Sequence, residues 1–327
     1  MVRLWIPEDL MRAVIAGDYG PPEGYTVGEL PVPRPGPGQL LVRVAAASIN
    51  PGDVVIPSGR FRDTTPLTFP HVPGNDFAGT VAETGPGVTG YAEGDEIFGY
   101  AAPRALRPML GPRPSMSTGS LAEYTVVEAD TPFVAHRPAG LTAEHAAALA
   151  TTGLTARALM ATAGVRPGER VLVVGATGGV GTTLVPLLAA AGAEVVATAT
   201  DEDAGLLRDL GAAETIGYAE PGYPSGVDAA FNLTLPGDAL TGVAAAVRPG
   251  GRLLTITFPV PRQDWTGRDD VELRFVLDME GVHGGMREVA DAGLRATIGR
   301  RYTLAEGAQA CVDFARRHTT GKLVVVV

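Results

Sequence analysis

Cysteine and long apolar runs are the scarcest features of this 327-residue sequence. Cys311 is the only cysteine, so no internal disulfide can form and no cysteine-rich zinc site is possible. A chain without disulfides agrees with a reducing cytoplasm, which is the location we expect. The N-terminus lacks the apolar core of a signal peptide, and no apolar stretch reaches about 18 residues, so we expect no membrane span.

Positive charge is sparse as well. The sequence has 26 Lys and Arg residues against 36 Asp and Glu, and its only lysine is Lys322. A broad basic face is therefore excluded, and we expect neither nucleic acid nor an anionic membrane as a partner. We interpret the preference for arginine as a genomic base-composition bias, which removes lysine from most catalytic roles.

The remaining composition is that of a well-cored globular protein, and the length suits two domains. From residue 11 to about 135, short β-rich runs alternate with glycine and proline turns, which predicts an all-β, barrel-like domain. From about residue 141, strands and helices alternate, which predicts a parallel sheet covered on both faces. The expected fold class is α/β. The pattern assigns no role to the residues before Met11.

A glycine-rich turn in the stretch VLVVGATGGVG lies between a predicted strand, Arg170 to Val174, and a predicted helix. Residues without side chains let backbone N–H groups approach phosphates, and a helix N-terminus adds partial positive charge. This strand–turn–helix context predicts that a dinucleotide pyrophosphate binds to Ala176, Thr177, Gly178, Gly179, Val180 and Gly181. A glycine turn that binds no ligand is the alternative.

The position that distinguishes the two nicotinamide dinucleotides is neutral. About 20 residues beyond the start of the glycine fingerprint, where an acid binds the ribose of NAD, the count reaches Thr198. A small neutral residue leaves room for the 2′-phosphate of NADP, with Thr200 and Tyr218 as further partners. The acids at 201–203 repel a phosphate, although they also suit the solvated first turn of a helix. We therefore predict NADPH as the cofactor, with a modest preference over NADH.

Several motifs occur in a fixed order along the chain: AASINPGD, VPGNDFAGTV, VTGYAEGDEIFG, GSLAEYTVV, AALATTGLTA, VLVVGATGGVG and HTTGKLVVVV. In this order they resemble the medium-chain dehydrogenase/reductase superfamily, and more closely its zinc-free quinone oxidoreductase-like branch. The resemblance implies a GroES-like β-rich catalytic domain over residues 1–138 and a Rossmann domain with a doubly wound parallel sheet over 139–278. Residues 279–327 would return to the catalytic domain. It also implies hydride transfer from NAD(P)H, usually in a homodimer.

The resemblance also implies that no zinc is bound. Zinc-dependent relatives carry a cysteine where this chain has Asn50 and a histidine where it has Asn75, and they have a four-cysteine structural lobe. Without a Lewis acid to polarise an alcohol, reduction of an activated acceptor is the better prediction. Quinones and α,β-unsaturated carbonyls are such acceptors.

The same resemblance assigns the loop NPGD to the active site. It places the Asn50 amide near the nicotinamide and lets Asp53 brace the loop, whereas an Asx-type turn before Pro51 is the alternative. Thr155, in TTGLTA, matches a threonine on the nicotinamide side of the cofactor. Its alternative is a helix-interior hydroxyl bonded to its own backbone.

Two later segments are expected to line the nicotinamide half of the site. Asn232 and the segment Thr255 to Phe258, which includes Thr257, follow strands of the predicted parallel sheet. Dinucleotides bind beyond the C-terminal ends of such strands.

The proton donor is not evident from the sequence. Some quinone reductases carry a tyrosine at the position of Val55, so a proton from water becomes the better prediction. Tyr100, Tyr124 and His71 are substitutes, although a packed strand aromatic or an ordinary turn residue explains each of them. The long loop at 101–119 either shapes the substrate mouth or is a solvated surface loop.

These observations predict a zinc-independent, NADPH-dependent reductase that transfers hydride to a quinone or to an α,β-unsaturated carbonyl, and whose partner is a small-molecule substrate. No residue stands out as an activated nucleophile, which agrees with chemistry carried by the cofactor. The alternative is a dinucleotide-binding protein with a structural or regulatory role and little catalytic activity.

Overall fold

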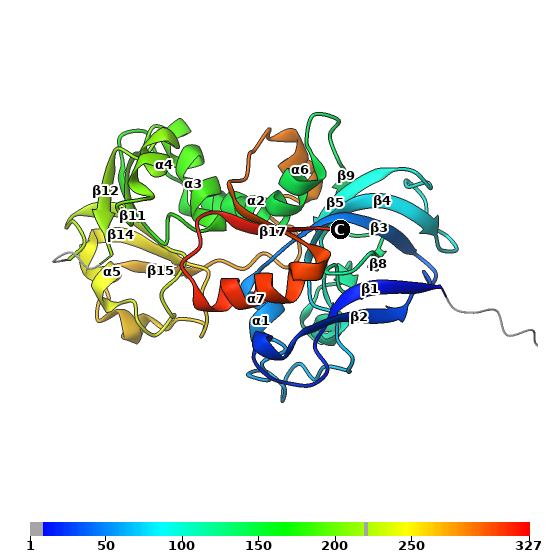
Figure 1. The fold of residues 1–327 in the computed structure, drawn as a ribbon. Coiled ribbons are helices and arrows are strands. Elements are labelled where there is room, and N and C mark those ends of the chain that lie inside the picture. The colour runs from blue at the N-terminus through cyan, green and yellow to red at the C-terminus, as the bar shows by residue number, and fades with distance from the viewer. Residues whose placement is uncertain (1–8, 219–221) are drawn as a thin grey trace, which may run out of the picture.

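The computed structural model describes residues 9–218 and 222–327, and its elements form a β-rich lobe and an α/β lobe (Figure 1). The β-rich sheet has the strand order β6-β7-β8-β3-β4-β5-β9, with β17 added to β3 and β16 added to β17. Its strands are β3 (Gln39–Ser48), β4 (Asp76–Thr84), β5 (Glu96–Tyr100), β6 (Ala102–Pro103), β7 (Met116–Ser117), β8 (Tyr124–Glu128), β9 (Val134–His136), β16 (Ile298–Thr303) and β17 (Lys322–Val326). A separate antiparallel ribbon joins β1 (Leu10–Ile15) and β2 (Thr26–Pro31).

The α/β lobe contains a six-stranded sheet in which every pair of neighbours is parallel. Its order is β12-β11-β10-β13-β14-β15, which is the 3-2-1-4-5-6 order of the Rossmann fold. The strands are β10 (Arg170–Val174), β11 (Glu194–Ala199), β12 (Glu214–Gly217), β13 (Val227–Asn232), β14 (Val247–Thr255) and β15 (Glu272–Phe275). The predicted fold class is confirmed.

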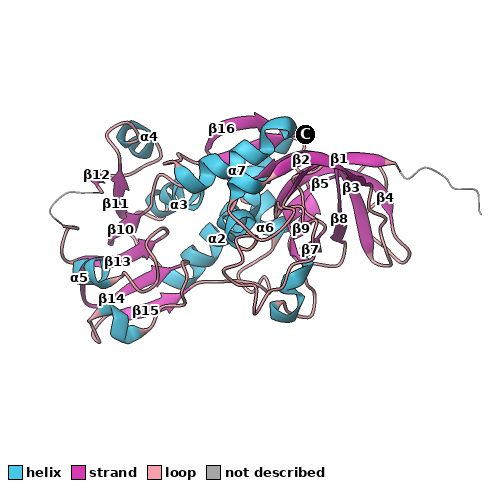
Figure 2. Cartoon of the chain, turned by 60° about the horizontal axis from the view of Figure 1, so that its bottom comes forward, coloured by secondary structure: helices cyan, strands magenta, loops and turns pink. Residues whose placement is uncertain are grey.

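Helices cover both faces of the parallel sheet. One face packs against α2 (Ala143–Ala163), α3 (Gly179–Ala190) and α4 (Ala204–Asp209), and the other packs against α5 (Thr241–Ala246). The remaining helices are α1 (Pro51–Val55), α6 (Met286–Asp291) and α7 (Gly307–Arg316), with short 3-10 turns at η1 (Pro22–Gly24), η2 (Arg104–Met109), η3 (Gln263–Thr266) and η4 (Leu304–Glu306). Figure 2 shows α2 and α7 between the two lobes.

Helix α2 belongs to both hydrophobic cores. Its first half, around Ala146 and Leu149, packs on β3, β4 and β5, whereas its second half, around Ala156 and Leu159, packs under the parallel sheet. Thr142 caps the helix by accepting a hydrogen bond from His145 N at 3.4 Å. Alanine side chains are short enough to let one helix approach two sheets closely.

The C-terminal segment returns to the β-rich lobe. β17 pairs antiparallel with β3, and α7 packs on the same side, next to α1 and the β1–β2 ribbon (Figure 1). The loop at 101–119 contains β6, η2 and β7, so it is more ordered than the sequence pattern indicates. The domain limits at 138/139 and 278/279 stay predictions, and residues 1–8 of the first domain lie outside the described residues.

Candidate active site

The glycine turn follows β10 and leads into α3. Gly175 has a φ of 86°, which a residue with a side chain rarely adopts, and Gly178 is the N-cap of α3. A Cβ on Gly181 would lie 2.4 Å from the Ala176 carbonyl oxygen, whereas a Cβ on Gly178 would meet only Gly175 O, at 3.5 Å. Gly181 therefore serves close packing, and Gly178 keeps the approach to the helix N-terminus open. This is the cradle that a pyrophosphate requires.

The residues that lead into α3 are held from two sides. Ala176 is fully buried and Thr177 is 2% exposed, so Ala176 shapes the turn rather than touching a ligand with its side chain. The Thr177 and Tyr218 hydroxyls lie 2.8 Å apart, and Thr177 O accepts a hydrogen bond from Gly321 N at 2.7 Å. Val180 packs against the core under the sheet.

Thr198 does not have the position that its proposed phosphate contact needs. It is fully buried, its Oγ1 accepts a hydrogen bond from Gly175 N at 2.9 Å, and it contacts Val173 O at 3.4 Å. The sequence count placed Thr198 correctly at the end of β11, but its hydroxyl supports the glycine turn. The predicted phosphate contact of Thr198 is therefore corrected to a structural role.

Asp203 follows β11 and is hydrogen-bonded to the segment that leads into β17. Its carboxylate accepts hydrogen bonds from Thr200 Oγ1 at 2.8 Å, from Thr320 Oγ1 at 2.7 Å and from the His318 ring at 2.8 Å. Burial raises the pKa of Asp203, but these three hydrogen bonds together hold it below its usual value. His318 also lies edge-on to Tyr218 at 6.2 Å. One of the three acids at 201–203 is thus a partly buried anchor and not a solvated first-turn residue.

The predicted catalytic loop forms α1 and the residues before it. Asn50 is the N-cap of this helix, and its backbone N–H donates to the Asp53 carboxylate at 2.7 Å. Gly74 N donates to the other Asp53 oxygen at 3.0 Å. Burial raises the pKa of Asp53 to about 7, although these two N–H donors favour the carboxylate form. Asp53 therefore braces the loop, as the resemblance implies.

A buried polar cluster joins this loop to the rest of the molecule. Lys322 Nζ donates to Ile49 O and Asn50 Oδ1, both at 2.7 Å, and forms an ion pair with Asp76 at 3.3 Å. Asp76 is fully buried and also accepts hydrogen bonds from Ser48 and Thr151. The only lysine of the chain therefore lies within the candidate site, although the scarcity of lysine gave no reason to expect it there.

The other predicted cofactor residues lie at different depths. Thr155 is half-buried on α2, one turn beyond Thr151, and the hydroxyl-to-backbone bond considered for it is made instead by Thr152, to Ala148 O. Asn232 is fully buried, and its amide bonds Leu235, Thr255 and Thr257.

Asn232 therefore orders the loop after β13, and its predicted place along the nicotinamide half of the site stays a prediction. Thr257 Oγ1 also donates to Leu235 O, at 2.6 Å. Phe258 is 46% exposed and packs edge-on against Phe275, with ring centres 5.3 Å apart. Of these residues, Phe258 alone presents much surface to solvent.

The substitutes for a tyrosine proton donor have different surroundings. Burial lowers the pKa of His71 to about 4, and its backbone pairs with Ala16, so it is a neutral turn residue. Burial raises the pKa of Tyr100, which packs edge-on against Phe133. Tyr124 lies in β8 and packs beside the β1–β2 ribbon. Neither His71 nor Tyr100 therefore has the environment of an activated acid near neutral pH.

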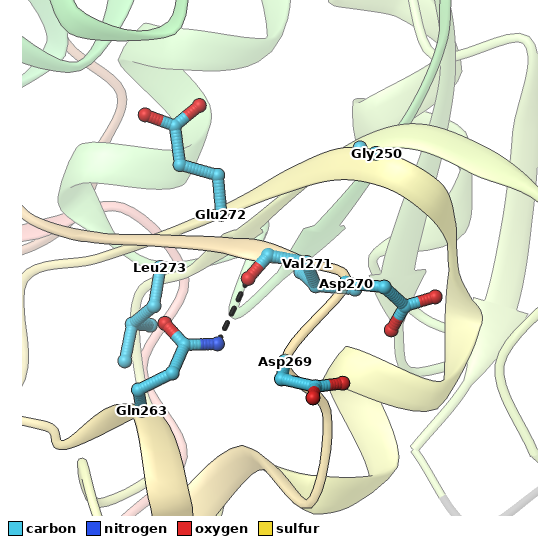
Figure 3. A pocket seen from close by; sticks show the side chains of 8 residues that line it. Gly250, Gln263, Asp269, Asp270, Val271, Glu272 and Leu273 are labelled. Carbon is cyan, nitrogen blue, oxygen red and sulfur yellow. Dashed lines mark hydrogen bonds between the residues drawn. The ribbon is translucent and has the colours of Figure 1, made fainter.

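The hollow drawn in Figure 3 is a different region. It lies at the N-terminal ends of β14 and β15, where Gly250, Gln263 and three acids, Asp269, Asp270 and Glu272, line it. Dinucleotides bind at the opposite ends of such strands. This acidic hollow is therefore not the candidate site.

Comparison with known proteins agrees with the geometry. The chain is 30% identical to a chloroplastic quinone oxidoreductase of Triphysaria versicolor, over 97% of this chain and 98% of the relative. The chain belongs to the medium-chain dehydrogenase/reductase superfamily, in its quinone oxidoreductase-like branch. Two models of this superfamily match: the alcohol dehydrogenase GroES-like domain at residues 36–139 and the zinc-binding dehydrogenase domain at residues 210–325.

Two further members of the superfamily extend this result. The chain is 30% identical to a chloroplastic NADPH-dependent alkenal/one oxidoreductase of Arabidopsis thaliana, over 98% of this chain and 80% of that protein. The solved quinone oxidoreductase of Coxiella burnetii matches with a TM-score of 0.85 at 26% identity, covering 98% of this chain and 100% of that one. The chain is accordingly an oxidoreductase of this superfamily.

The prediction from sequence missed four polar residues of the site: Asp76, Lys322, His318 and Thr320. Asp76 lies in the motif VPGNDFAGTV, and the other three residues lie in the motif HTTGKLVVVV. Nothing in the spacing of these motifs indicates that Asp76 and Lys322 form an ion pair. One signal for Lys322 was present in the sequence. It is the only lysine in a chain whose other basic residues are arginines, so a specific role for it could have been considered.

Of the part of the chain that the structure describes, no helix is long and apolar enough to cross a membrane.

Proposed function

We propose that this protein is a zinc-independent reductase that uses NADPH to reduce a quinone or an α,β-unsaturated carbonyl. One observation carries the proposal: the glycine turn of the α/β lobe and the Asn50 loop of the β-rich lobe are both held by β17 and the residues just before it. A cofactor on the first element is thereby brought to the polar groups of the second.

The glycine turn suits a dinucleotide. Gly178 leaves the N-terminus of α3 open, and the first N–H groups of a helix of this length have no partner within the helix. Thr177 and Tyr218 stand at the edge of the turn. NADPH, when bound, supplies the hydride, and the protein supplies binding, orientation and exclusion of water.

Asn50 is the group we assign to the reacting end. Its Oδ1 is used by Lys322, so its Nδ2 is the atom left to donate, and within the described chain Nδ2 has only a long contact of 3.5 Å to Ser48 O. A donor of this kind suits a carbonyl oxygen that gains negative charge as hydride arrives at a conjugated carbon. The Asn75 Oδ1 is buried without a partner among the same residues, but an amide oxygen only accepts, so Asn50 Nδ2 is the donor that we assign.

Independence from zinc rests on the charge of this cluster. Lys322 Nζ lies 2.7 Å from Asn50 Oδ1, so a cation already contacts the side chain that stands where zinc-dependent relatives carry a ligand. Two amides and an ammonium group form a poor donor set for zinc, which prefers thiolate, imidazole and carboxylate. Metal analysis of the purified protein should give far less than one zinc per chain.

The preference for NADPH is expected to be modest. A relative at 30% identity is named as NADPH-dependent, and no acid replaces Thr198 at the end of β11. The negative charges of Asp203 and its neighbours repel the 2′-phosphate, although the Asp203 carboxylate already accepts hydrogen bonds from His318 and Thr320. Tyr218, 45% exposed, is the phosphate partner that we retain from the sequence prediction, together with Thr200.

We propose further that the enzyme is a cytoplasmic homodimer. Strand β15 forms the edge of the parallel sheet, and beyond its end Leu277 is 52% exposed. Val260, beside Phe258, is 51% exposed, so apolar surface collects near this edge. Light scattering at micromolar concentration measures the mass, and a monomer would contradict the assignment.

Steady-state kinetics test the proposed activity. The purified protein is assayed with NADPH and NADH against a simple benzoquinone, an aliphatic enone and a saturated ketone. We expect turnover of the quinone or the enone and none of the ketone, because without zinc an isolated carbonyl is not polarised. Binding of NADPH without turnover of any acceptor would favour the structural or regulatory alternative.

A further inference from the structure

The residues around Lys322 connect the two lobes through one side chain. On the cofactor side, Gly321 N donates to Thr177 O at 2.7 Å, and Gly321 forms an isolated parallel bridge with Gly178. The lysine stem then passes over the start of α3, because a Cβ placed on Gly179 would lie 2.5 Å from Lys322 Cδ. The backbone before Lys322 and its stem thus both touch the glycine turn.

The other end of this side chain enters the β-rich lobe. Nζ donates to Ile49 O and Asn50 Oδ1, and it lies 3.3 Å from Asp76 Oδ2. Lys322 is 5% exposed, so these bonds are not weakened by surrounding water. The ammonium group therefore has three acceptors, which matches its three N–H donors.

Asp76 is held from other elements, which keeps the lysine from moving. Ser48 Oγ donates to Asp76 Oδ2 at 2.8 Å, and the Thr151 backbone and hydroxyl both donate to Oδ1. Strand β3 and helix α2 thus fix the counter-ion, and the counter-ion helps to fix Nζ. Because Nζ can only donate, it must face the oxygen of the Asn50 amide and leave Nδ2 on the opposite side.

We infer that Lys322 is a positioning residue that orients the Asn50 amide and couples the cofactor turn to the catalytic loop. The inference rests on the proposed function for its catalytic consequence, but the coupling itself does not require turnover. Gly179 contributes to this arrangement, because a Cβ at that position would lie 2.5 Å from Lys322 Cδ and would displace the lysine side chain.

Hydrogen exchange tests the coupling without an acceptor. In Lys322→Met, which keeps the stem but removes the donor, amides at 49–56 should exchange about tenfold faster, while amides of β11 and β13 keep their rates. Adding NADPH should slow exchange at 49–56 in the parent protein and leave it unchanged in the variant. The control is Arg301→Met, which removes a cation from an exposed ion pair with Glu144 and should change neither segment.

A second variant covers the case in which Lys322→Met does not fold. Asp76→Asn combined with Lys322→Met removes both buried charges, so no unpaired ion remains. It should fold and show the same faster exchange at 49–56. Unchanged exchange at 49–56 in a folded variant would overturn the inference, whatever the protein reduces.

A double-mutant cycle tests the link to Asn50 during turnover. Lys322→Met should lower kcat about 30-fold and change the NADPH dissociation constant less than about threefold, since the residue orients a reacting group and not the cofactor. In the Asn50→Ala background the same change should cost little, because the amide to be oriented is gone. Equal losses in both backgrounds would overturn the inference. A parent protein that reduces no acceptor contradicts the proposed function instead and leaves the exchange result to decide.

Discussion

The glycine turn and the Lys322 cluster are neighbours that are built in opposite ways. The turn takes its residues from one contiguous stretch, 175–181, between β10 and α3. The cluster takes Asn50, Asp76, Thr151 and Lys322 from four separate segments, which are the loop before α1, β4, α2 and β17. The geometry of the turn is set by residues that are adjacent in sequence, whereas the cluster forms only when distant segments pack together. The two parts should therefore fail differently when they are damaged.

Gly178→Val should give the largest effect. A Cβ at this position meets only Gly175 O, at 3.5 Å, so we expect the fold to survive, but the branched group would lie where backbone N–H groups approach phosphate. We expect NADPH affinity to fall about 1,000-fold, or about 4 kcal/mol. Fluorescence titration measures it, with Gly140→Val, in open space, as the control. Wild-type affinity in the variant would show that the pyrophosphate binds elsewhere.

Asp76→Ala should damage stability before it damages binding. It leaves the buried Lys322 ammonium without its counter-ion, and breaking a buried pair costs about 3–5 kcal/mol. Urea unfolding measures the loss. Glu83→Ala removes the acid of an exposed pair with Arg34 and should cost less than about 1 kcal/mol. Equal small losses in both variants would mean that the cluster is not a stabilising centre.

Asp53 should make stability depend on pH. Its folded pKa of about 7 lies above the ordinary value of 3.8, so between these pH values the folded chain retains a proton that the unfolded chain has lost. The free energy of unfolding should therefore fall as pH rises from about 4 to about 7, by at most about 4 kcal/mol at 1.36 kcal/mol per pKa unit.

Asp53→Asn should remove that pH dependence. His71, whose pKa is lowered to about 4, acts in the opposite direction between about 4 and 6.5 but is present in both proteins, so the difference between them isolates Asp53. Urea unfolding from pH 4.5 to 8.5 measures it. A difference that stays constant across this range would contradict the raised pKa.

Glu202→Arg should give the smallest effect, because it changes an exposed residue in the turn after β11. An arginine there offers a fork of donors to a 2′-phosphate, so the ratio of kcat/KM for NADPH over NADH should rise about fivefold, or about 1 kcal/mol. The ratio should also grow with salt in the parent protein as repulsion from the acids at 201–203 is screened. A parent preference for NADH at both high and low salt would reverse the cofactor assignment.

The fold follows closely from the sequence because its signals are local. Thr142 and Gly164 mark the ends of α2, and β10 occupies the predicted span of Arg170 to Val174. The structure of β16 and β17 within the β-rich sheet was implied by resemblance alone, since pairing with β3 depends on contacts far apart in the chain.

The candidate site follows the same division. The glycine turn and the Asp53 brace were predicted from residues adjacent in sequence, and the structure places them as expected. Thr198 lies at the predicted strand end, but its hydroxyl supports the glycine turn, because a sequence does not show where a hydroxyl points. Lys322 was missed because its partners come from β4 and from the loop between β3 and α1, which are far from Lys322 in the sequence.

The pairing of β3 with β17 sets an order for assembly during synthesis. β3 leaves the ribosome well before β17, which is one of its neighbours in the sheet. The parallel sheet of β10 to β15 is complete before that point, so it can fold while the β-rich lobe still lacks a strand. Until β17 is synthesised, the edge of β3 near Ser48 has no strand to pair with, and the Asp76 carboxylate lacks the Lys322 ammonium group. The Lys322 cluster therefore becomes native only after the parallel sheet can fold, and a chain that still lacks β17 has the α/β lobe without this cluster.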